Sequence, residues 1–199
     1  MKIVLATKNE GKLRELKAAA QHAGLKGAEF VSLKSCGEFP DAVEDGKTFE
    51  ENALIKAKYY AEKTGLACLA DDSGLEVDVL GGAPGVMSAR FAGGVHADDA
   101  ANNQKLLEEL NNKNVAESAA RYRCVIAFCD TEGQTLVAEG VCEGVVKNTA
   151  AGTGGFGYDP YFYVGEKTLA QISMGEKEKI SHRGKALRRM TELLEEYLK

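Results

Sequence analysis

The chain lacks the features of several large classes of protein. It has no excess of basic residues, because 25 Lys and Arg stand against 30 Asp and Glu, for a formal net charge of -5. A surface that coats nucleic acid needs a basic stripe, so we expect no nucleic-acid partner. No stretch approaches the roughly 18 apolar residues of a membrane span, so we expect no membrane partner. Any phosphate site must therefore be local, made by a few placed groups.

The sequence also lacks the cysteine patterns of metal-binding and secreted domains. It has five cysteines, an odd count, and no CxxC pair, so neither a zinc site nor a disulfide framework fits. Cys68, Cys124 and Cys129 lie in apolar runs, which favours buried reduced thiols. The first apolar run is too short for a signal peptide and is soon interrupted by Lys8. We therefore expect a cytoplasmic protein.

The composition and the order of patterns predict an α/β fold. The chain has 199 residues, 44% of them hydrophobic and 28% charged, which is ordinary for a soluble globular protein with a substantial core. Strand and helix patterns interleave through the first half, and a hairpin dominates the middle, which indicates a mixed sheet. No linker separates two independent halves, so we expect one domain over residues 1–199.

Hydrophobic periodicity and turn residues place the elements. A first helix carries Leu13, Leu16 and Ala20 inward and ends at Gly24. The predicted strands are 2–7, 29–33, 66–70, 75–80, 120–130, 134–146 and 161–164. The second predicted helix is 51–65, opened by the capping-box residues Thr48 and Glu51 and closed by Gly65. The last two are 98–113, with Leu106, Leu107 and Leu110 inward, and 181–199, with Leu187, Met190, Leu194 and Leu198 inward. The predicted loops are 36–49, 81–94 and 150–160.

Acidic side chains occur in two separated places. The predicted strand in LADDSGLEVD runs straight into Asp71 and Asp72, while Glu44 and Asp45 lie in an irregular loop. Magnesium prefers one or two carboxylates together with phosphate oxygens, and an acid from each place suits that scheme if the fold joins them. The alternative is that Asp71 and Asp72 cap a turn, which is common for Asp before Ser-Gly.

The segment TKNEGK joins the first strand to the first helix. Backbone N–H groups at such a junction attract anions, and Thr7, Asn9 and Lys12 add two neutral donors and a charge. It is not a Walker A loop, since only Gly11 and Lys12 match that pattern. The alternative is an ordinary loop with a solvated lysine. Lys56, on the helix after the acidic loop, either approaches the same phosphates or is solvated.

The segment GTGGFGYDP combines glycines with aromatic residues. Four glycines in six residues let the backbone approach a ligand closely, and Phe156 and Tyr158 are interleaved with them. A stacking surface for a planar base is one interpretation. The other is a tight turn in which Phe156 packs inward.

Positive and donor side chains gather at the start of the last helix. Lys177 and Lys179 precede His182 and Arg183, and cations at a helix N-terminus oppose its dipole unless they bind something. His182 and Arg183 are donors that can read keto oxygens on a base. The alternative is a structural His–Arg pair.

Together these groups form a phosphate cradle, a metal carboxylate site, an aromatic platform and a base-edge reader. The chain resembles the inosine/xanthosine triphosphate pyrophosphatase family over its whole length. The resemblance rests on LATKNEGKLRELK, EDGKTFEENALIKA, LADDSGLEVDVLGGAPGVMSARFAG, AGTGGFGYDPYF and EKEKISHRGKAL, in the family's order. It implies hydrolysis of the non-standard purine nucleoside triphosphates ITP, dITP and XTP to the monophosphate and pyrophosphate, which cleanses the nucleotide pool.

The resemblance also implies the architecture and the site. It implies an elongated mixed β-sheet flanked by helices, two lobes with a central cleft, Mg²⁺ as cofactor and a homodimer. Glu44 and Asp72 match the magnesium ligands, Asp72 matches the general base, and Asp45 receives no role. The implied substrate-binding residues are Thr7, Asn9, Lys12, Lys56, Ser73, Phe156, Gly157, Tyr158, Asp159, Lys177, His182 and Arg183.

Two alternatives to this function stay open at this point. Related pyrophosphatases act on pyrimidine or methylated nucleotides, but their opening motif resembles TKNEGK less well, and the SHR stretch argues against them. A non-enzymatic nucleotide sensor would use the same pocket. Magnesium-dependent release of pyrophosphate separates an enzyme from a sensor.

Overall fold

The protein forms two compact units. The structure, a computed structural model, describes residues 1–23, 25, 27–94 and 98–199. Unit 1 comprises Met1–Asp72, Cys124–Gly140 and His182–Lys199, and unit 2 comprises Ser73–Arg123 and Val141–Ser181. The expected helix end at Gly24 lies outside the described residues, so it stays a prediction.

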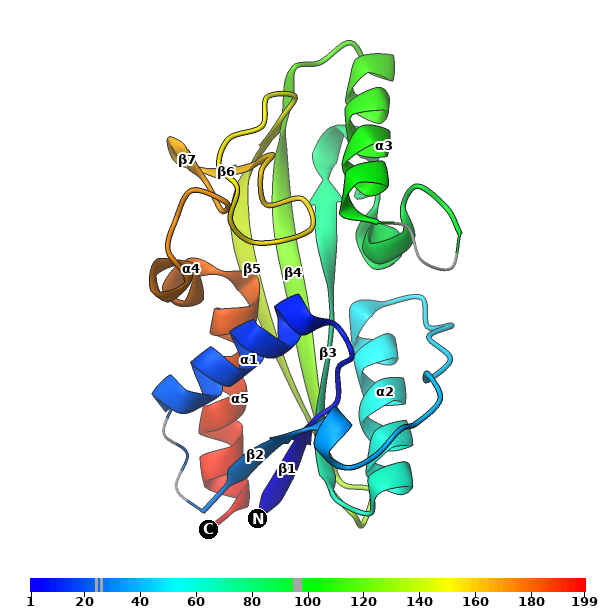
Figure 1. The fold of residues 1–199 in the computed structure, drawn as a ribbon, viewed down its shortest axis with the longest axis vertical. Helices are drawn as coiled ribbons and strands as arrows, with labels where there is room; N and C mark the ends of the chain where they lie inside the picture. Colours follow the sequence, from blue (N-terminus) through cyan, green and yellow to red (C-terminus); the bar gives the residue numbers. More distant parts are fainter. Residues whose placement is uncertain (24, 26, 95–97) are drawn as a thin grey trace. The chain divides into compact units, whose positions relative to one another are not determined.

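The strands form a mixed sheet, as expected from the sequence (Figure 1). They are β1 (Lys2–Leu5), β2 (Glu29–Ser32), β3 (Ala67–Val77), β4 (Glu117–Cys129), β5 (Thr135–Lys147), β6 (Phe162–Val164) and β7 (Lys167–Thr168). Their order is β2-β1-β3-β4-β5-β6-β7. β1 is parallel to both β2 and β3, whereas β6 is antiparallel to β5 and β7.

The helices match the predicted positions, with one addition. They are α1 (Glu10–Ala23), α2 (Phe49–Thr64), α3 (Asp99–Asn112), α4 (Met174–Ile180) and α5 (His182–Tyr197), with short 3-10 helices at Leu33–Ser35, Asp78–Leu80 and Gly85–Arg90. The sequence did not predict α4, although Ser173 and Glu176 form a capping box at its start. Within the predicted loop 81–94, residues Gly85–Arg90 form a 3-10 helix. Among the described residues, no helix is both long and apolar enough to cross a membrane.

Unit 1 has its core where α1 and α5 pack on the sheet. Figure 1 shows these two helices side by side, with both termini at the end of the unit near β1 and β2. Leu16 of α1 joins Leu5 and Leu69 of the strands in one buried cluster. The inward stripe predicted for the last helix is confirmed, because Met190 and Leu194 are fully buried in that cluster.

Helix α2 begins and ends where the sequence predicts. The Thr48 hydroxyl accepts a hydrogen bond from the Glu51 N–H at 3.1 Å, and the Glu51 carboxylate accepts one from the Thr48 N–H at 3.3 Å. This capping box satisfies two backbone donors of the first turn. Gly65 ends the helix with φ of 65°, a left-handed conformation that glycine adopts without steric cost. The start of α2 is therefore fixed just after the acidic loop.

The paired acids lie inside a strand, which corrects the predicted boundary. We expected one strand to end at Ala70, just before the acids, and a second to begin at Leu75, but β3 runs without a break from Ala67 to Val77. Asp71 and Asp72 are both buried and extended, so the alternative in which they cap a turn is wrong. Residues 78–80, predicted as strand, form a 3-10 helix. Turn-forming residues in DDSG misled the prediction because tertiary partners, described below, hold the acids in the strand.

Unit 2 has a separate core built around α3. Leu106 and Leu110 of α3 are fully buried and pack in one cluster with Leu75, Val77 and Phe162. Leu107, expected in the same inward stripe, is only half-buried. Asp98 caps α3, since its carboxylate accepts a hydrogen bond from the Ala101 N–H at 2.7 Å. The first turn of α3 is thus defined without any contribution from Asp99.

Candidate active site

The predicted site residues fall into two groups, one in each unit. Unit 1 holds the predicted phosphate, metal and catalytic residues and the pair at the start of α5: Thr7, Asn9, Lys12, Glu44, Lys56, Asp72, His182 and Arg183. Unit 2 holds Ser73 and the predicted base-binding residues Phe156, Gly157, Tyr158, Asp159 and Lys177.

The strand order explains why the first group converges. β1 lies between β2 and β3, and the chain leaves β1 through α1 toward β2 but enters β3 from α2. The carboxyl end of β1 therefore lies at a topological switch point, beside the middle of β3, and open α/β sheets bind ligands at such points. The loop after β1 carries Thr7 to Lys12, and β3 carries Asp71 and Asp72. The two segments meet there, because the Lys12 Nζ lies 3.2 Å from the Asp71 Oδ2.

The loop after β1 is held by its own side chains. The Thr7 hydroxyl accepts a hydrogen bond from the Asn9 N–H at 3.2 Å, and the Asn9 side-chain oxygen accepts one from the Lys12 N–H at 2.9 Å. Asn9 is therefore the N-cap of α1, a structural role that the sequence interpretation did not include. The cap fixes the direction in which Lys12 leaves the helix.

Asp71 is the centre of a buried ionic cluster. Its side chain is almost inaccessible, and its Oδ2 lies 3.2 Å from the Arg183 Nε, from the Arg183 Nη2 and from the Lys12 Nζ. Burial alone would raise the pKa of Asp71, but the Lys12 ammonium and the Arg183 guanidinium outweigh it and hold that pKa below its ordinary value. Asp71 is therefore a permanent anion that ties the phosphate loop to α5. The sequence interpretation offered Asp71, beside Asp72, as a candidate magnesium ligand or a turn cap and did not include this role.

Arg183 is held between two carboxylates. It is 1% exposed and pairs with Glu15 of α1 as well as with Asp71. Burial would lower the pKa of Arg183, but Asp71 and Glu15 raise it above its ordinary value, so the guanidinium stays charged. Its neighbour His182 is buried too. These contacts anchor the start of α5 before any base is bound.

Gly140 of β5 brings α5 close to the sheet. A Cβ at position 140 would collide with the His182 carbonyl oxygen and with the Ala186 nitrogen, both of which are backbone atoms. Only glycine permits this approach, since backbone cannot move aside as a flexible side chain can. The sequence contains no signal that distinguishes this glycine from the other glycines of the strand.

Two carboxylates converge on the Lys56 ammonium. Its Nζ lies 2.6 Å from the Glu44 Oε2 and 3.5 Å from the Asp72 Oδ1. Burial would lower the pKa of Lys56, but the charges of Asp72 and Glu44 raise it above its ordinary value. The structure therefore brings Glu44, Lys56 and Asp72 together, as the sequence predicted for one acid from each place.

Glu44 and Asp72 fit a magnesium ion. Their oxygens already face one cationic group, and magnesium takes one or two protein carboxylates with water and phosphate oxygens completing its shell. The part of the chain that the structure describes contains no cluster of three or more His, Cys, Asp or Glu side chains arranged for a metal. A two-carboxylate site completed by substrate needs no such cluster.

Asn52 connects the acidic loop to Asp72. Its side-chain N–H donates to the Asp72 Oδ2 at 3.1 Å, and its side-chain oxygen accepts from the Gly46 N–H at 2.9 Å. Asn52 is 2% exposed, and a Cβ at Gly46 would stand 2.7 Å from its side-chain oxygen. In the sequence, Asn52 and Lys56 are four positions apart, which places them on one face of the helix. The structure shows that this amide holds one Asp72 oxygen and the loop that carries Glu44.

The second group is built on Asp159, in unit 2. The Asp159 Oδ2 accepts a hydrogen bond from the Phe156 N–H at 2.9 Å and lies 2.5 Å from the Lys177 Nζ. The Lys177 Nζ also lies 5.0 Å from the centroid of the Phe156 ring, within the range of a cation–π contact. The Phe156 side chain is half-buried, whereas Lys177 and Asp159 are buried. The structure thus brings three of the predicted base-binding residues together.

The other members of the FGYD stretch have structural contacts. Tyr158 lies in the core of unit 2, where its hydroxyl donates to the Ser88 carbonyl oxygen at 2.7 Å, and burial raises the pKa of Tyr158. The Gly157 N–H donates to the Asp99 Oδ2 at 2.6 Å, and the Gly157 carbonyl oxygen accepts from the Asn103 amide at 2.9 Å. Phe156 is therefore the aromatic side chain of this stretch that is left partly accessible. Asp99 and Asn103 carry no signal in the sequence that predicts their contacts with Gly157.

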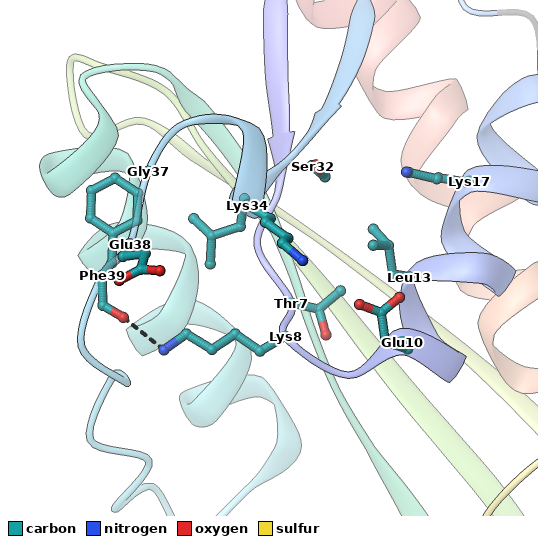
Figure 2. A pocket seen from close by; sticks show the side chains of 11 residues that line it. Thr7, Lys8, Glu10, Leu13, Lys17, Ser32, Lys34, Gly37, Glu38 and Phe39 are labelled. Carbon is teal, nitrogen blue, oxygen red and sulfur yellow. Dashed lines mark hydrogen bonds between the residues drawn. The ribbon is translucent and has the colours of Figure 1, made fainter.

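Unit 1 also contains a cavity beside the loop that follows β1. Its volume is about 550 Å³, and it is lined from β2, α1 and the segment after β2. Figure 2 shows Phe39 at one side, with the Lys8 Nζ donating to the Phe39 carbonyl oxygen at 2.7 Å. Thr7 is the one predicted site residue in its lining, so this cavity does not coincide with the acids and lysines described above.

Comparisons with known proteins agree on one family. The model of the Ham1 family matches residues 3–193. A dITP/XTP pyrophosphatase of Desulforamulus reducens is 51% identical over 98% of this chain and 96% of its own length. That of Bacillus licheniformis is 47% identical over 98% of both chains. The structure of a HAM1 protein from Coxiella burnetii has a TM-score of 0.86 and 41% identity, covering 98% of this chain and 99% of that one.

Proposed function

Because this chain belongs to the Ham1 family, as the sequence resemblance predicted, we propose that it hydrolyses non-standard purine nucleoside triphosphates to the monophosphate and pyrophosphate. The substrates would be ITP, dITP and XTP. The observation that carries the proposal is the convergence of Glu44 and Asp72 on the Lys56 ammonium, beside the contact of Lys12 with Asp71. Two cations and two metal-ligating acids at a switch point suit a triphosphate.

The phosphate chain would bind at the carboxyl end of β1. Lys12 and Lys56 supply positive charge, and Thr7 and Asn9 stand at the start of α1, whose dipole favours an anion. The ion pair with Asp71 holds the Lys12 side chain in place. Because both lysines are already oriented by carboxylates, little side-chain freedom is lost when the substrate binds.

Asp72 would act on the attacking water. Its Oδ2 is held by the Asn52 amide, so its carboxylate has a defined direction before substrate arrives. It would orient or deprotonate the water that attacks the α-phosphorus, with pyrophosphate leaving. Glu44 and Asp72 are the residues that would hold magnesium, which supplies neutralisation of phosphate charge and a template for the scissile bond.

Each unit contains residues that we expect to recognise the base. Phe156 offers a ring for stacking, with Lys177 and Asp159 at its edge. Inosine and xanthosine carry a keto oxygen at position 6 that accepts a hydrogen bond from His182 or Arg183, whereas adenine presents an amino donor there. A buried site left with unpaired donors rejects adenine strongly.

The cellular setting is also part of the proposal. We expect a cytoplasmic enzyme, since the five cysteines in the described residues are thiols rather than disulfides, four of them buried. A homodimer is expected from the family resemblance, and light scattering of the purified protein tests it.

The experiment is pyrophosphate release from a panel of nucleoside triphosphates, with magnesium and with chelator. We expect fast, magnesium-dependent release from ITP, dITP and XTP and little from ATP or GTP. Release from pyrimidine or methylated nucleotides instead would favour the related pyrophosphatases. Tight binding of ITP with no release would make the protein a nucleotide sensor.

A further inference from the structure

Both peptide groups on either side of Phe156 are held by aspartates. The Phe156 N–H donates to Asp159 at 2.9 Å, and the next N–H along the chain, that of Gly157, donates to Asp99 at 2.6 Å. The direction of the Cα–Cβ bond of Phe156 depends on the orientation of these two peptide planes. Asp99 and Asp159 therefore fix the direction in which the Phe156 side chain leaves the backbone.

Asn103 forms a second hydrogen bond to Gly157. Its amide donates to the Gly157 carbonyl oxygen at 2.9 Å, so one residue has both its backbone polar groups held by side chains of α3. Asp99 and Asn103 are four positions apart and thus lie on the same face of the helix. Gly157 has φ of 63°, one of many backbone conformations open to glycine, and the two side-chain hydrogen bonds restrict it to this one.

Stability of α3 does not explain these contacts. Asp98 already caps the helix through the Ala101 N–H, and the leucines of α3 supply its core contacts. Asp99 is exposed, and Gly157 is half-buried, so the bonds do not satisfy deeply buried backbone. Asp99 and Asn103 both bind Gly157, which is 58 and 54 positions away from them in the sequence. Gly157 is the residue next to Phe156, whose ring is partly accessible.

We propose that Asp99 and Asn103 are positioning residues for the purine base, acting through Gly157 on Phe156. This inference rests on the proposed function, in which Phe156 is the stacking surface. The two side chains would set the affinity for the base and leave the phosphate chemistry of unit 1 unchanged. Their loss would raise KM for ITP with little change in kcat.

The test is a double-mutant cycle between the two anchors and the ring. Two net hydrogen bonds at about 0.5–1.5 kcal/mol each predict that Asp99→Ala with Asn103→Ala raises KM for ITP about 5- to 150-fold. Phe156→Ala removes the stacking surface and raises KM about 5- to 100-fold. In the Phe156→Ala background, the anchor substitutions should change KM less than about twofold, since their target is gone.

Controls separate positioning from general loosening of the fold. Inhibition by IMP, which carries the base, should weaken in the anchor variant, while inhibition by pyrophosphate, which does not, should stay the same. Asp99→Asn keeps an oxygen that can accept from the Gly157 N–H, and it should retain KM within about twofold. Gln104→Ala, on the same helix with a hydrogen bond to Glu108, should behave as wild type.

Each outcome decides the proposal. Additive effects in the cycle, or equal weakening of IMP and pyrophosphate inhibition, would overturn the positioning role while leaving the proposed function standing. Failure of the wild-type protein to release pyrophosphate from ITP would overturn the proposed function, and the inference with it. Faster amide exchange at 155–158 in the anchor variant, with an unchanged melting temperature, is the expected structural signature.

Discussion

The two units hold their functional side chains by different means. In unit 1, Asp71 and Asp72 stand within a network of lysine, arginine and carboxylate groups, most of them buried. In unit 2, one ion pair between Lys177 and Asp159 supports an aromatic ring, and the remaining contacts are hydrogen bonds to loop backbone.

Under the proposed function, this difference would correspond to two kinds of chemical task. Transfer of a phosphoryl group requires charges fixed in place before the reaction, because preorganised charges cost no reorganisation in the transition state. Recognition of a flat base requires a shaped surface, which glycine-rich backbone and one ring can supply. We therefore expect substitutions of Asp71 and Asp72 to lower stability or turnover, and substitutions around Phe156 to raise KM.

The largest effect is expected at Asp72. Asp72→Asn keeps the size of the side chain but removes the base and a metal ligand, so kcat for ITP should fall by about 10² to 10⁴. Pyrophosphate release measures kcat, and circular dichroism checks that the fold is intact. Asp45→Asn, an exposed acid of the same loop as Glu44, is the control and should be near wild type. Near-normal turnover in Asp72→Asn would remove Asp72 from the role.

The second effect is on stability and concerns Asp71. Asp71→Ala leaves the Arg183 guanidinium buried with one of its two carboxylates missing, and breaking a buried pair costs about 3–5 kcal/mol. Urea unfolding of wild type and variant measures the difference. Asp45→Ala should change the free energy of unfolding by less than about 0.5 kcal/mol. A small loss in Asp71→Ala would mean that Glu15 alone suffices for Arg183.

A smaller effect is expected in unit 2. Lys177→Met removes the cation beside the Phe156 ring and the partner of Asp159, so KM for ITP should rise about tenfold while kcat changes less than about threefold. Steady-state kinetics separate the two parameters. Lys179→Met, an exposed lysine of the same helix, serves as control. A fall in kcat with unchanged KM would contradict the division of labour between the units.

The smallest effect concerns Asp130, a carboxylate of unit 1 held by hydrogen bonds rather than by cations. The Tyr197 hydroxyl donates to it at 2.5 Å, and the N–H groups of Glu132 and Gln134 donate at 2.9 and 2.8 Å. The bond from Tyr197, followed by these backbone bonds, lowers the pKa of Asp130. A lowered pKa stabilises the fold above the unfolded value, about 3.9, and the contribution is lost as pH falls through the folded value.

Comparison of wild type with Asp130→Asn tests that sign. The difference in free energy of unfolding should be about 1 kcal/mol or less at pH 7, which is the usual net contribution of a hydrogen bond, and it should shrink below about pH 4. Urea titrations at both pH values measure it. A difference that grows on acidification would show that the hydrogen bonds do not favour the charged form.

Much of the fold was readable from local signals. Thr48, Glu51 and Gly65 delimit α2 because capping and left-handed glycine are local effects. Helix α4 was missed although Ser173 and Glu176 carry the same signature. The break predicted in β3 was wrong because local turn preference in DDSG was outweighed by distant partners of the acids.

The candidate site divides in the same way. Carboxylates and lysines could be named from residue type and spacing, and the structure brings Glu44, Lys56 and Asp72 together. The supporting contacts could not be named, since Asn52 and Asp99 are ordinary helix residues until their partners are known.

The sequence by itself determined the family, the elements with local end signals and the residue types of the chemistry. Tertiary structure alone decided that Asp71 is an anion shared by Lys12 and Arg183. These two residues lie 171 positions apart in the sequence. The physical reason is that propensity and capping act over a few residues. Burial of a charge is tolerable only where the whole fold supplies its counter-charges.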